Sequence, residues 1–161
     1  MPRRVEILFR KRNIRAVATL LDTAAPKTCG ALWESLPLEG EVYHAKWANN
    51  EVYTLVPPLK TEPGAENSTI YPMMGDLGYF YTPQSQGGPP HFRDILTKYG
   101  GVVDLAIFYG RNNHLLGPAG YVPANVFGTI TENLAGIAEA CESVWREGGV
   151  GERLVFRTLP T

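Results

Sequence analysis

The alternation of hydrophobic and polar positions predicts a chain built mainly from short β-strands. Residues 3–10 and 14–21 are rich in Val, Ile, Leu and Phe and flank a polar turn at residues 11–13, which indicates an antiparallel hairpin. Residues 102–110 are almost continuously apolar and therefore predict a buried strand. Further strands are predicted over residues 42–47, 52–56, 75–81, 121–129 and 153–159.

Two segments instead carry the period of an amphipathic helix. The first begins at Thr23, a competent N-cap, and ends before Pro37. Its apolar face comprises Ala25, Cys29, Leu32, Trp33 and Leu36. The second follows a capping box formed by Thr129 and Glu132 and is closed by two glycines at residues 148–149. We therefore expect a mainly β fold with two helices, the first after the second strand and the other near the end of the chain.

The hairpin over residues 42–56, which turns at Asn49 and Asn50, has an unusual pattern. Its polar and aromatic side chains are Tyr43, His44, Lys46, Trp47, Glu51 and Tyr53. A strand with one buried and one solvated face alternates more sharply than this. The pattern indicates that one face of the hairpin lines a concave, partly polar site.

Two long irregular segments interrupt the strands, at residues 57–74 and 82–101. The first is rich in Pro, Glu, Ser, Thr and Gly, and the second contains a short helix over residues 91–99. Long loops in a compact domain are usually functional lids or disordered. The aromatic and apolar content of the second loop favours an ordered lid or a contact between subunits of a homo-oligomer.

Composition excludes several classes of protein. The 161 residues fit one domain over residues 1–161, and 44% hydrophobic with 19% charged residues is an ordinary globular composition. Fifteen basic and sixteen acidic residues give a net charge of −1, which argues against a nucleic-acid partner. No apolar run approaches the roughly 20 residues that cross a membrane. We expect no membrane association and no signal peptide, and therefore a cytoplasmic protein.

The cysteines and histidines do not suggest a metal site. Cys29 and Cys141 fall on the apolar stripes of the two helices, and they predict buried free thiols because cytosolic disulfides are rare. His44, His91 and His114 are scattered, with no pair at ligand spacing. We expect no metal ion and no cofactor.

Several motifs resemble a known family. The run Ala24-Ala25-Pro26-Lys27-Thr28 is similar to the start of the first helix in the cyclophilins, where it also follows a β-hairpin. Residues 75–79 and 107–110 look like small bacterial cyclophilin-like proteins of unassigned function. The run from residues 33–38 through 43–47 to 51–53 resembles one uncharacterised family of this kind. The resemblance covers most of the chain and implies a closed cyclophilin-like β-barrel capped by helices.

The chain departs from true cyclophilins at their reaction site. Their isomerase strand reads Phe-His-Arg, whereas this chain reads Tyr43-His44-Ala45-Lys46, and Asn49-Asn50-Glu51 replaces a Gln-Gly-Gly-Asp element. Lys offers a point charge without the planar fork of Arg and does not replace it. Peptidyl-prolyl isomerase activity is therefore not expected.

The candidate catalytic residues are His44, Lys46 and Glu51. His44 and Lys46 share one strand face and form either an acid/base pair or part of a solvated surface. Glu51 is either a general base or the partner of Lys46 in a cross-strand ion pair. Arg111, in the polar loop after the apolar strand, could hold a carboxylate bidentately. The full set of candidate ligand-binding residues is Tyr43, His44, Lys46, Trp47, Tyr53, Tyr109, Arg111, Asn113 and Asn125.

Three functions fit these patterns. The first is binding of a small polar metabolite, in particular one with a carboxylate, by the hairpin and the loop over residues 111–114. The second is a hydrolase or isomerase reaction on a small molecule in the same site. The third is a non-catalytic assembly module, in which the two long loops pack on sister subunits.

Overall fold

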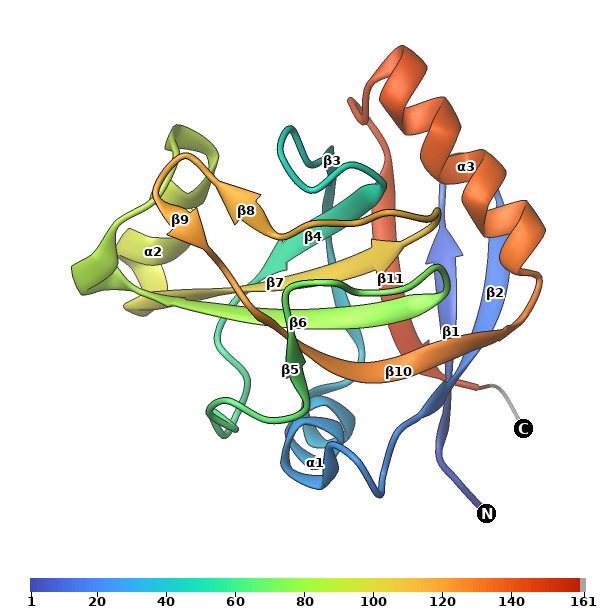
Figure 1. Ribbon diagram of the computed structural model, residues 1–161, viewed down its shortest axis with the longest axis horizontal. Helices are drawn as coiled ribbons and strands as arrows, with labels where there is room; N and C mark the ends of the chain where they lie inside the picture. The colour runs from blue at the N-terminus through green and yellow to red at the C-terminus, as the bar shows by residue number, and fades with distance from the viewer. Residues whose placement is uncertain (160–161) are drawn as a thin grey trace.

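A closed β-barrel forms the centre of the computed structural model, which describes residues 1–159 (Figure 1). The strands are β1 Arg4–Phe9, β2 Ile14–Leu20, β3 Leu38–His44, β4 Glu51–Val56, β5 Ser68–Thr69, β6 Asp76–Pro83, β7 Gly101–Phe108, β8 Leu116–Gly117, β9 Gly120–Tyr121, β10 Ala124–Glu132 and β11 Arg153–Thr158. The helices are α1 Pro26–Ser35, α2 Arg93–Tyr99 and α3 Leu134–Glu147, with 3₁₀ turns at Gln84–Gln86 and Pro90–Phe92.

The ring closes through one additional strand pair. The main sheet has nine strands in the order β2-β1-β11-β3-β4-β7-β6-β10-β5, and β2 also pairs with β10. Because β5 pairs only with β10, eight strands form the closed ring, and every pair in it is antiparallel. Closure removes the unpaired edges that an open sheet would expose. The mainly β, closed barrel predicted from the sequence is confirmed.

The interior of the barrel is a single apolar core to which two helices contribute. Inward-facing residues of the strands, such as Ile7 and Phe156, are fully buried there. Leu32 of α1 and Ile137 of α3 belong to the same cluster, and Figure 1 shows these helices on opposite sides of the ring. Cys29 and Cys141 are buried, free thiols, as predicted.

The first helix starts later than predicted and has a different cap. It begins at Pro26, and no side chain of the adjacent residues caps it. Instead, Glu66 accepts hydrogen bonds from the backbone N–H groups of Lys27 and Thr28, at 3.1 and 2.8 Å. Thr23 is therefore not the N-cap. The helix ends at Ser35, before Pro37, as predicted.

The predicted capping box of the last helix is wrong. The β10 strand runs through both Thr129 and Glu132, because its pairing with β2 extends to Glu132. Asn133 then takes a left-handed conformation (φ 61°), which turns the chain into α3. The Asn133 amide donates to the carbonyl of Arg15 at 2.7 Å, so the turn is tied to the first hairpin.

The loop over residues 82–101 is more ordered than an open loop. It contains the end of β6, both 3₁₀ turns and α2, and α2 confirms the short helix that the sequence predicted over residues 91–99. Leu96 of α2 packs with Leu55 and Val102 on the outer face of the barrel. By contrast, residues 57–74 contain only the two-residue strand β5.

The central hairpin is shifted toward the N-terminus relative to its prediction. Its first strand, β3, runs from Leu38 to His44, and the turn begins at Ala45 rather than after Trp47. Tyr43 pairs with Tyr53, and His44 pairs with Val52. The early end of β3 places Lys46 and Trp47 in the turn rather than in a strand.

Candidate functional site

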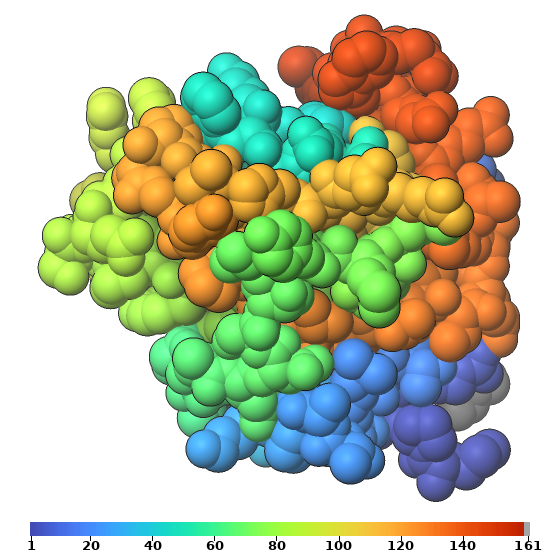
Figure 2. All heavy atoms as spheres, in the orientation of Figure 1, coloured from blue at the N-terminus to red at the C-terminus, as the bar shows by residue number. Residues whose placement is uncertain are grey.

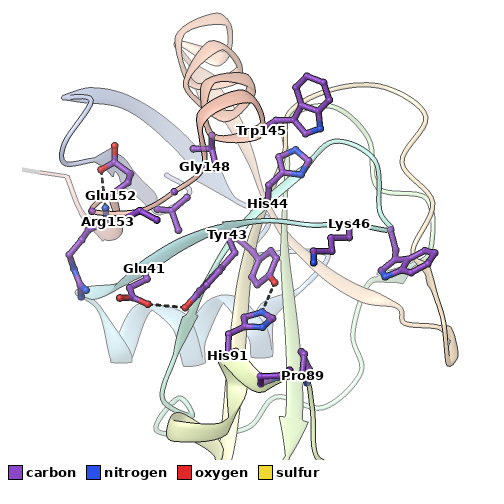
Figure 3. Close-up of a pocket in the computed structure, with 18 residues that line it drawn as sticks. Glu41, Tyr43, His44, Lys46, Pro89, His91, Trp145, Gly148, Glu152 and Arg153 are labelled. Atoms are coloured by element: carbon purple, nitrogen blue, oxygen red, sulfur yellow. Dashed lines mark hydrogen bonds between the residues drawn. The ribbon is translucent and has the colours of Figure 1, made fainter.

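A cavity of about 900 Å³ lies beside the central hairpin, within the usual size range of small-molecule sites (Figure 3). Its walls come from β3, the turn after it, Tyr53 of β4, the segment before α2, the end of α3 and the loop leading into β11. The lining residues are Glu41, Val42, Tyr43, His44, Lys46, Trp47, Tyr53, Pro89, Pro90, His91, Val144, Trp145, Gly148, Gly149, Val150, Gly151, Glu152 and Arg153.

One wall is brought close to β3 by a glycine. A Cβ atom at Gly149 would collide with the carbonyl oxygen of Val42, so only glycine lets this loop approach the strand. The approach leaves Trp145, 68% exposed, at the rim of the cavity. Trp47 is also at the rim and is 63% exposed. Two exposed indole rings therefore border the opening.

Three aromatic rings form a second wall. Tyr43 and Tyr53 stack with ring centroids 5.5 Å apart, because they are directly paired across β3 and β4. The His91 ring lies 4.7 Å from that of Tyr43, and its Nε2 shares a 2.8 Å hydrogen bond with the Tyr53 hydroxyl. Burial, followed by the charge of Lys46, lowers the pKa of His91. These rings give the cavity an aromatic side with polar edges (Figure 3).

His44 is held by both of its ring nitrogens. Its Nδ1 lies 2.7 Å from the carbonyl oxygen of Ala45, which can only accept, so Nδ1 carries the proton. Its Nε2 therefore accepts from the Tyr109 hydroxyl, also at 2.7 Å. Burial lowers the pKa of His44, which favours this neutral form. With both nitrogens engaged, His44 is not available as a general base in this arrangement.

Three charged side chains of the cavity already have hydrogen-bond partners within the protein. Glu152 is buried and accepts backbone hydrogen bonds from Lys11, Arg12 and Arg153 together with one from the Arg12 side chain. Although burial opposes it, this set of donors lowers the pKa of Glu152. Arg153 donates to Glu39 at 3.1 Å. Glu41 accepts from the Tyr43 hydroxyl at 2.9 Å.

Lys46 is the exception among these charges. It is exposed at the cavity and forms no ion pair or side-chain hydrogen bond with residues 1–159. The predicted ion pair with Glu51 is absent, because Lys46 lies in the turn and Glu51 is buried (5% exposed) on the outer face of β4. Lys46 is therefore free to meet an anionic group in the cavity.

Glu51 lies outside the cavity lining, in an apolar environment. Its register partner is Phe108 on β7, and no hydrogen bond or ion pair joins its side chain to the described residues. Burial raises the pKa of Glu51 to about 8. Asp104, on the same outer face, has its pKa raised by burial and then by the charge of Glu51.

The structure brings together five of the candidate ligand-binding residues and separates four. Those that line the large cavity are Tyr43, His44, Lys46, Trp47 and Tyr53. Tyr109 lines a neighbouring cavity of about 470 Å³, which shares Trp145 with the first. Arg111 is exposed and lines neither cavity; its carbonyl accepts from the Asn50 amide at 2.7 Å.

The two candidate asparagines hold loops together. Asn113 is buried, accepts from the backbone N–H of Asn50 and donates to the carbonyls of Pro72 and Gly110. Asn125 donates to the Gly64 carbonyl at 2.7 Å and accepts from the backbone N–H of Glu66, near α1. Neither side chain lines a cavity.

Sequence reasoning missed part of the site. His91, Trp145 and the segment over residues 148–153 line the cavity but lie far from the hairpin in the chain. Two signals were present: glycines at positions 148, 149 and 151, and a Trp at the end of the helical stripe. Neither signal says that the segment packs on β3.

Two further properties bear on the kind of site. Within residues 1–159, no group of three or more His, Cys, Asp and Glu side chains is arranged to hold a metal ion. In the same part of the chain, no helix has the length and apolarity to cross a bilayer.

Comparison with known proteins identifies a family and a fold. The family model described as "Protein of unknown function (DUF3830)" matches residues 7–156. No curated protein matches the sequence. These residues span nearly all of the barrel and the three helices.

Two solved structures are similar in fold. One, described as the structure of McbB in complex with tryptophan, has a TM-score of 0.68 and 21% identity; the match covers 98% of this chain and 45% of that one. The other is the solution structure of the hypothetical protein AF2241 from Archaeoglobus fulgidus, with a TM-score of 0.51, 18% identity and coverage of 98% and 95%. The chain thus spans less than half of the first neighbour's length. These likenesses concern the fold alone, and they confirm a cyclophilin-like barrel.

Proposed function

This chain belongs to the family of unknown function DUF3830, whose description names no activity, and we propose from its own residues that the large cavity binds a small, flat metabolite bearing a carboxylate. The observation that carries the proposal is Lys46, an unpaired cation at a cavity with aromatic walls. The Tyr43, Tyr53 and His91 rings provide aromatic surface for the ligand, and the positive charge of Lys46 complements its carboxylate.

The partners of the other charges support the same ligand. Glu152 is ion-paired with Arg12, so it repels an anion less than a free carboxylate would. Glu41 keeps its negative charge, although its carboxylate accepts a hydrogen bond from the Tyr43 hydroxyl. Trp145 and Trp47 at the rim can cover a planar ligand, because aromatic rings stack favourably at about 4.5–7 Å. The fold neighbour bound to tryptophan is an example of a protein with this fold that holds a small aromatic carboxylate.

The test is ligand-induced thermal stabilisation with a panel of aromatic and aliphatic carboxylates. We expect Lys46→Met to abolish the shift given by carboxylates while leaving the melting temperature without ligand unchanged. Lys60→Met, an exposed lysine outside the cavity, is the matched control. Arg111→Met tests the alternative site in the loop after β7. If Arg111→Met removes the shift and Lys46→Met does not, the ligand site is not this cavity.

Catalysis in the same site is less well supported than binding. Both ring nitrogens of His44 are engaged, and Glu51 does not line the cavity. The lining residues include no Ser, Thr or Cys that could serve as a nucleophile. A metabolite screen that follows consumption as well as binding separates the two functions. Turnover that is lost in His44→Ala would favour a hydrolase or isomerase.

Assembly into a homo-oligomer is a second candidate, and a specific surface favours it. Figure 2 shows the segment around residues 70–74 beside the β8–β9 hairpin on one face of the protein. The exposed apolar side chains of these segments are Tyr71, Met73, Met74, Leu116, Tyr121 and Val122. Exposed apolar groups of this kind often mark protein contacts. Light scattering at micromolar concentration tests this function, and a monomer would exclude it.

A further inference from the structure

The segment between β6 and α2 forms one wall of the large cavity without being part of a core. Residues 84–91 are all exposed, and none of them belongs to a hydrophobic cluster of the described residues. Three of them, Pro89, Pro90 and His91, line the cavity. Figure 3 shows Pro89 and His91 on one side of the cavity and Trp145, at the end of α3, on the other. The segment therefore borders the cavity opposite α3.

Both ends of this segment are anchored, whereas its middle is not. At the first end, the backbone N–H of Gln84 donates to the carbonyl of Gly100 at 3.1 Å. At the other end, Phe92 packs against the buried cluster that contains Leu96 of α2. Between these points the chain turns at Gly87, which has a left-handed φ of 67°, and a Cβ atom there would meet no atom within 4 Å. The result is a short, exposed arm between two fixed points.

His91 joins this arm to the barrel. Within residues 1–159, the 2.8 Å bond between its Nε2 and the Tyr53 hydroxyl is the one hydrogen bond between residues 85–91 and a barrel strand. The His91 ring also lies 4.7 Å from the ring of Tyr43. Strand pairing fixes both tyrosines, so they form a rigid seat for the imidazole. Segments with few buried contacts and few hydrogen bonds open locally at a low cost in free energy, so the arm can move once His91 leaves this seat.

The composition of the arm separates the two roles that a long loop in this position can have. Contacts between subunits of a homo-oligomer bury mostly apolar side chains. Residues 84–91 read Gln-Ser-Gln-Gly-Gly-Pro-Pro-His and carry no large hydrophobic side chain. A polar arm whose one aromatic ring is turned toward the cavity is instead typical of a lid, which keeps its outer side in water.

We propose that residues 84–91 form a lid on the large cavity, which the contact of His91 with the two barrel tyrosines holds closed. When His91 leaves its seat, the two prolines before it move with it, because proline restricts the backbone on both of its sides. The cavity then widens on the side opposite α3. The inference goes beyond the proposed function, since it concerns access to the cavity whatever ligand enters.

Distances between spin labels across the cavity test the lid without any ligand. Ser85→Cys places one label on the arm, and Val150→Cys places another on the opposite wall, where Val150 is 93% exposed. Cys29 and Cys141 are buried, so the native thiols should not react with the label. We expect double electron–electron resonance to give one main distance when the seat is intact and a second, longer distance when it is removed.

Two substitutions remove the seat to different degrees. Tyr53→Phe removes the hydroxyl that bonds to His91, so the fraction of molecules at the longer distance should rise about twofold to tenfold, which is the effect of one hydrogen bond on an equilibrium. His91→Ala also removes the ring contact with Tyr43 and should raise this fraction at least as far. The control pairs the label at Val150 with one at Thr97, an exposed position on α2, and its distances should stay unchanged.

A lid and a fixed wall give different results. If neither substitution changes the distances measured from Ser85→Cys, the segment is a fixed wall and the lid is wrong. If the label at Thr97 shifts as far as the label at Ser85, the seat holds α2 rather than a lid, which also contradicts the proposal. Neither result depends on Lys46, so carboxylate binding in the cavity is judged separately by its thermal shift.

Discussion

Tyr109 donates its hydroxyl proton to Nε2 of His44 over 2.7 Å, and this bond lies between the two cavities. His44 lines the larger cavity and Tyr109 the smaller one. His44 is the last residue of β3 and points to the same inward side as Val42. Tyr109 follows directly after β7, and its ring belongs to the same core, so the two side chains meet there. The bond therefore fixes a histidine that the sequence suggested as a base.

Removal of the tyrosine hydroxyl should change the titration of His44. In Tyr109→Phe, Nε2 loses the donor that stabilises the neutral ring, so the pKa of His44 should rise toward its ordinary value. The free energy of unfolding should fall by about 1 kcal/mol. Nuclear magnetic resonance titration of the imidazole protons measures the pKa directly. An unchanged pKa would show that the Tyr109 hydroxyl does not donate to His44 in solution.

The protein should not accelerate proline isomerisation. The step at which true cyclophilins place an arginine is occupied here by Ala45, and the adjacent Lys46 lacks the planar fork. In an assay with a proline-containing peptide, we expect the uncatalysed rate, with an authentic cyclophilin as positive control. A rate increase that disappears in Lys46→Met would mean that a point charge is sufficient for this reaction.

Much of the fold could be predicted because it depends on local patterns. The alternation in residues 3–21 and the apolar run at 102–110 gave strands close to β1, β2 and β7. The predicted helix caps are wrong because the start of each helix depends on contacts with residues that are distant in the sequence. Thr23 is a good N-cap in isolation, but the cap of α1 is Glu66, far along the chain. Thr129 and Glu132 form a good capping box, but pairing of β10 with β2 keeps both in a strand.

Only the part of the site that comes from one continuous segment, the central hairpin, could be predicted from the sequence. The hairpin contributed five expected residues because poor alternation within one strand is visible in the sequence. His91 and Trp145 came from other elements, and their approach depends on how α2 and α3 pack on the barrel. Asn113 and Asn125 show the opposite error, since both were predicted to bind a ligand and neither lines a cavity. A polar residue near a strand end can bind a ligand or fix a loop, and only its hydrogen-bond partners separate these roles.

The distant cap of α1 should contribute measurably to stability. Glu66→Ala removes acceptors from the backbone N–H groups of Lys27 and Thr28 and from the Thr28 hydroxyl. We expect the free energy of unfolding to fall by about 1–2 kcal/mol in urea denaturation. Glu34→Ala, an exposed residue on the same helix, should change it by less than about 0.5 kcal/mol. Equal effects of the two substitutions would argue against the cap.

The buried Glu51 should make the folded protein less stable as the pH rises. Its pKa is raised from 4.5 to about 8 by burial, so between these values the folded state retains a proton that the unfolded state has lost. The stability contributed by the protonated group is fully present below pH 4.5 and is lost as the pH rises toward 8. Glu51→Gln removes this dependence, because its amide does not ionise.

We therefore expect Glu51→Gln to become more stable than the wild-type protein with increasing pH, by about 1.4 kcal/mol per unit over that window. Denaturation curves at pH 5, 6, 7 and 8 measure the difference between the two proteins. Glu139→Gln, on the exposed side of α3, is the control and should give a difference that does not grow with pH. A constant difference for Glu51→Gln as well would mean that Glu51 is ionised in the folded protein, with a donor or a solvent path that satisfies its charge.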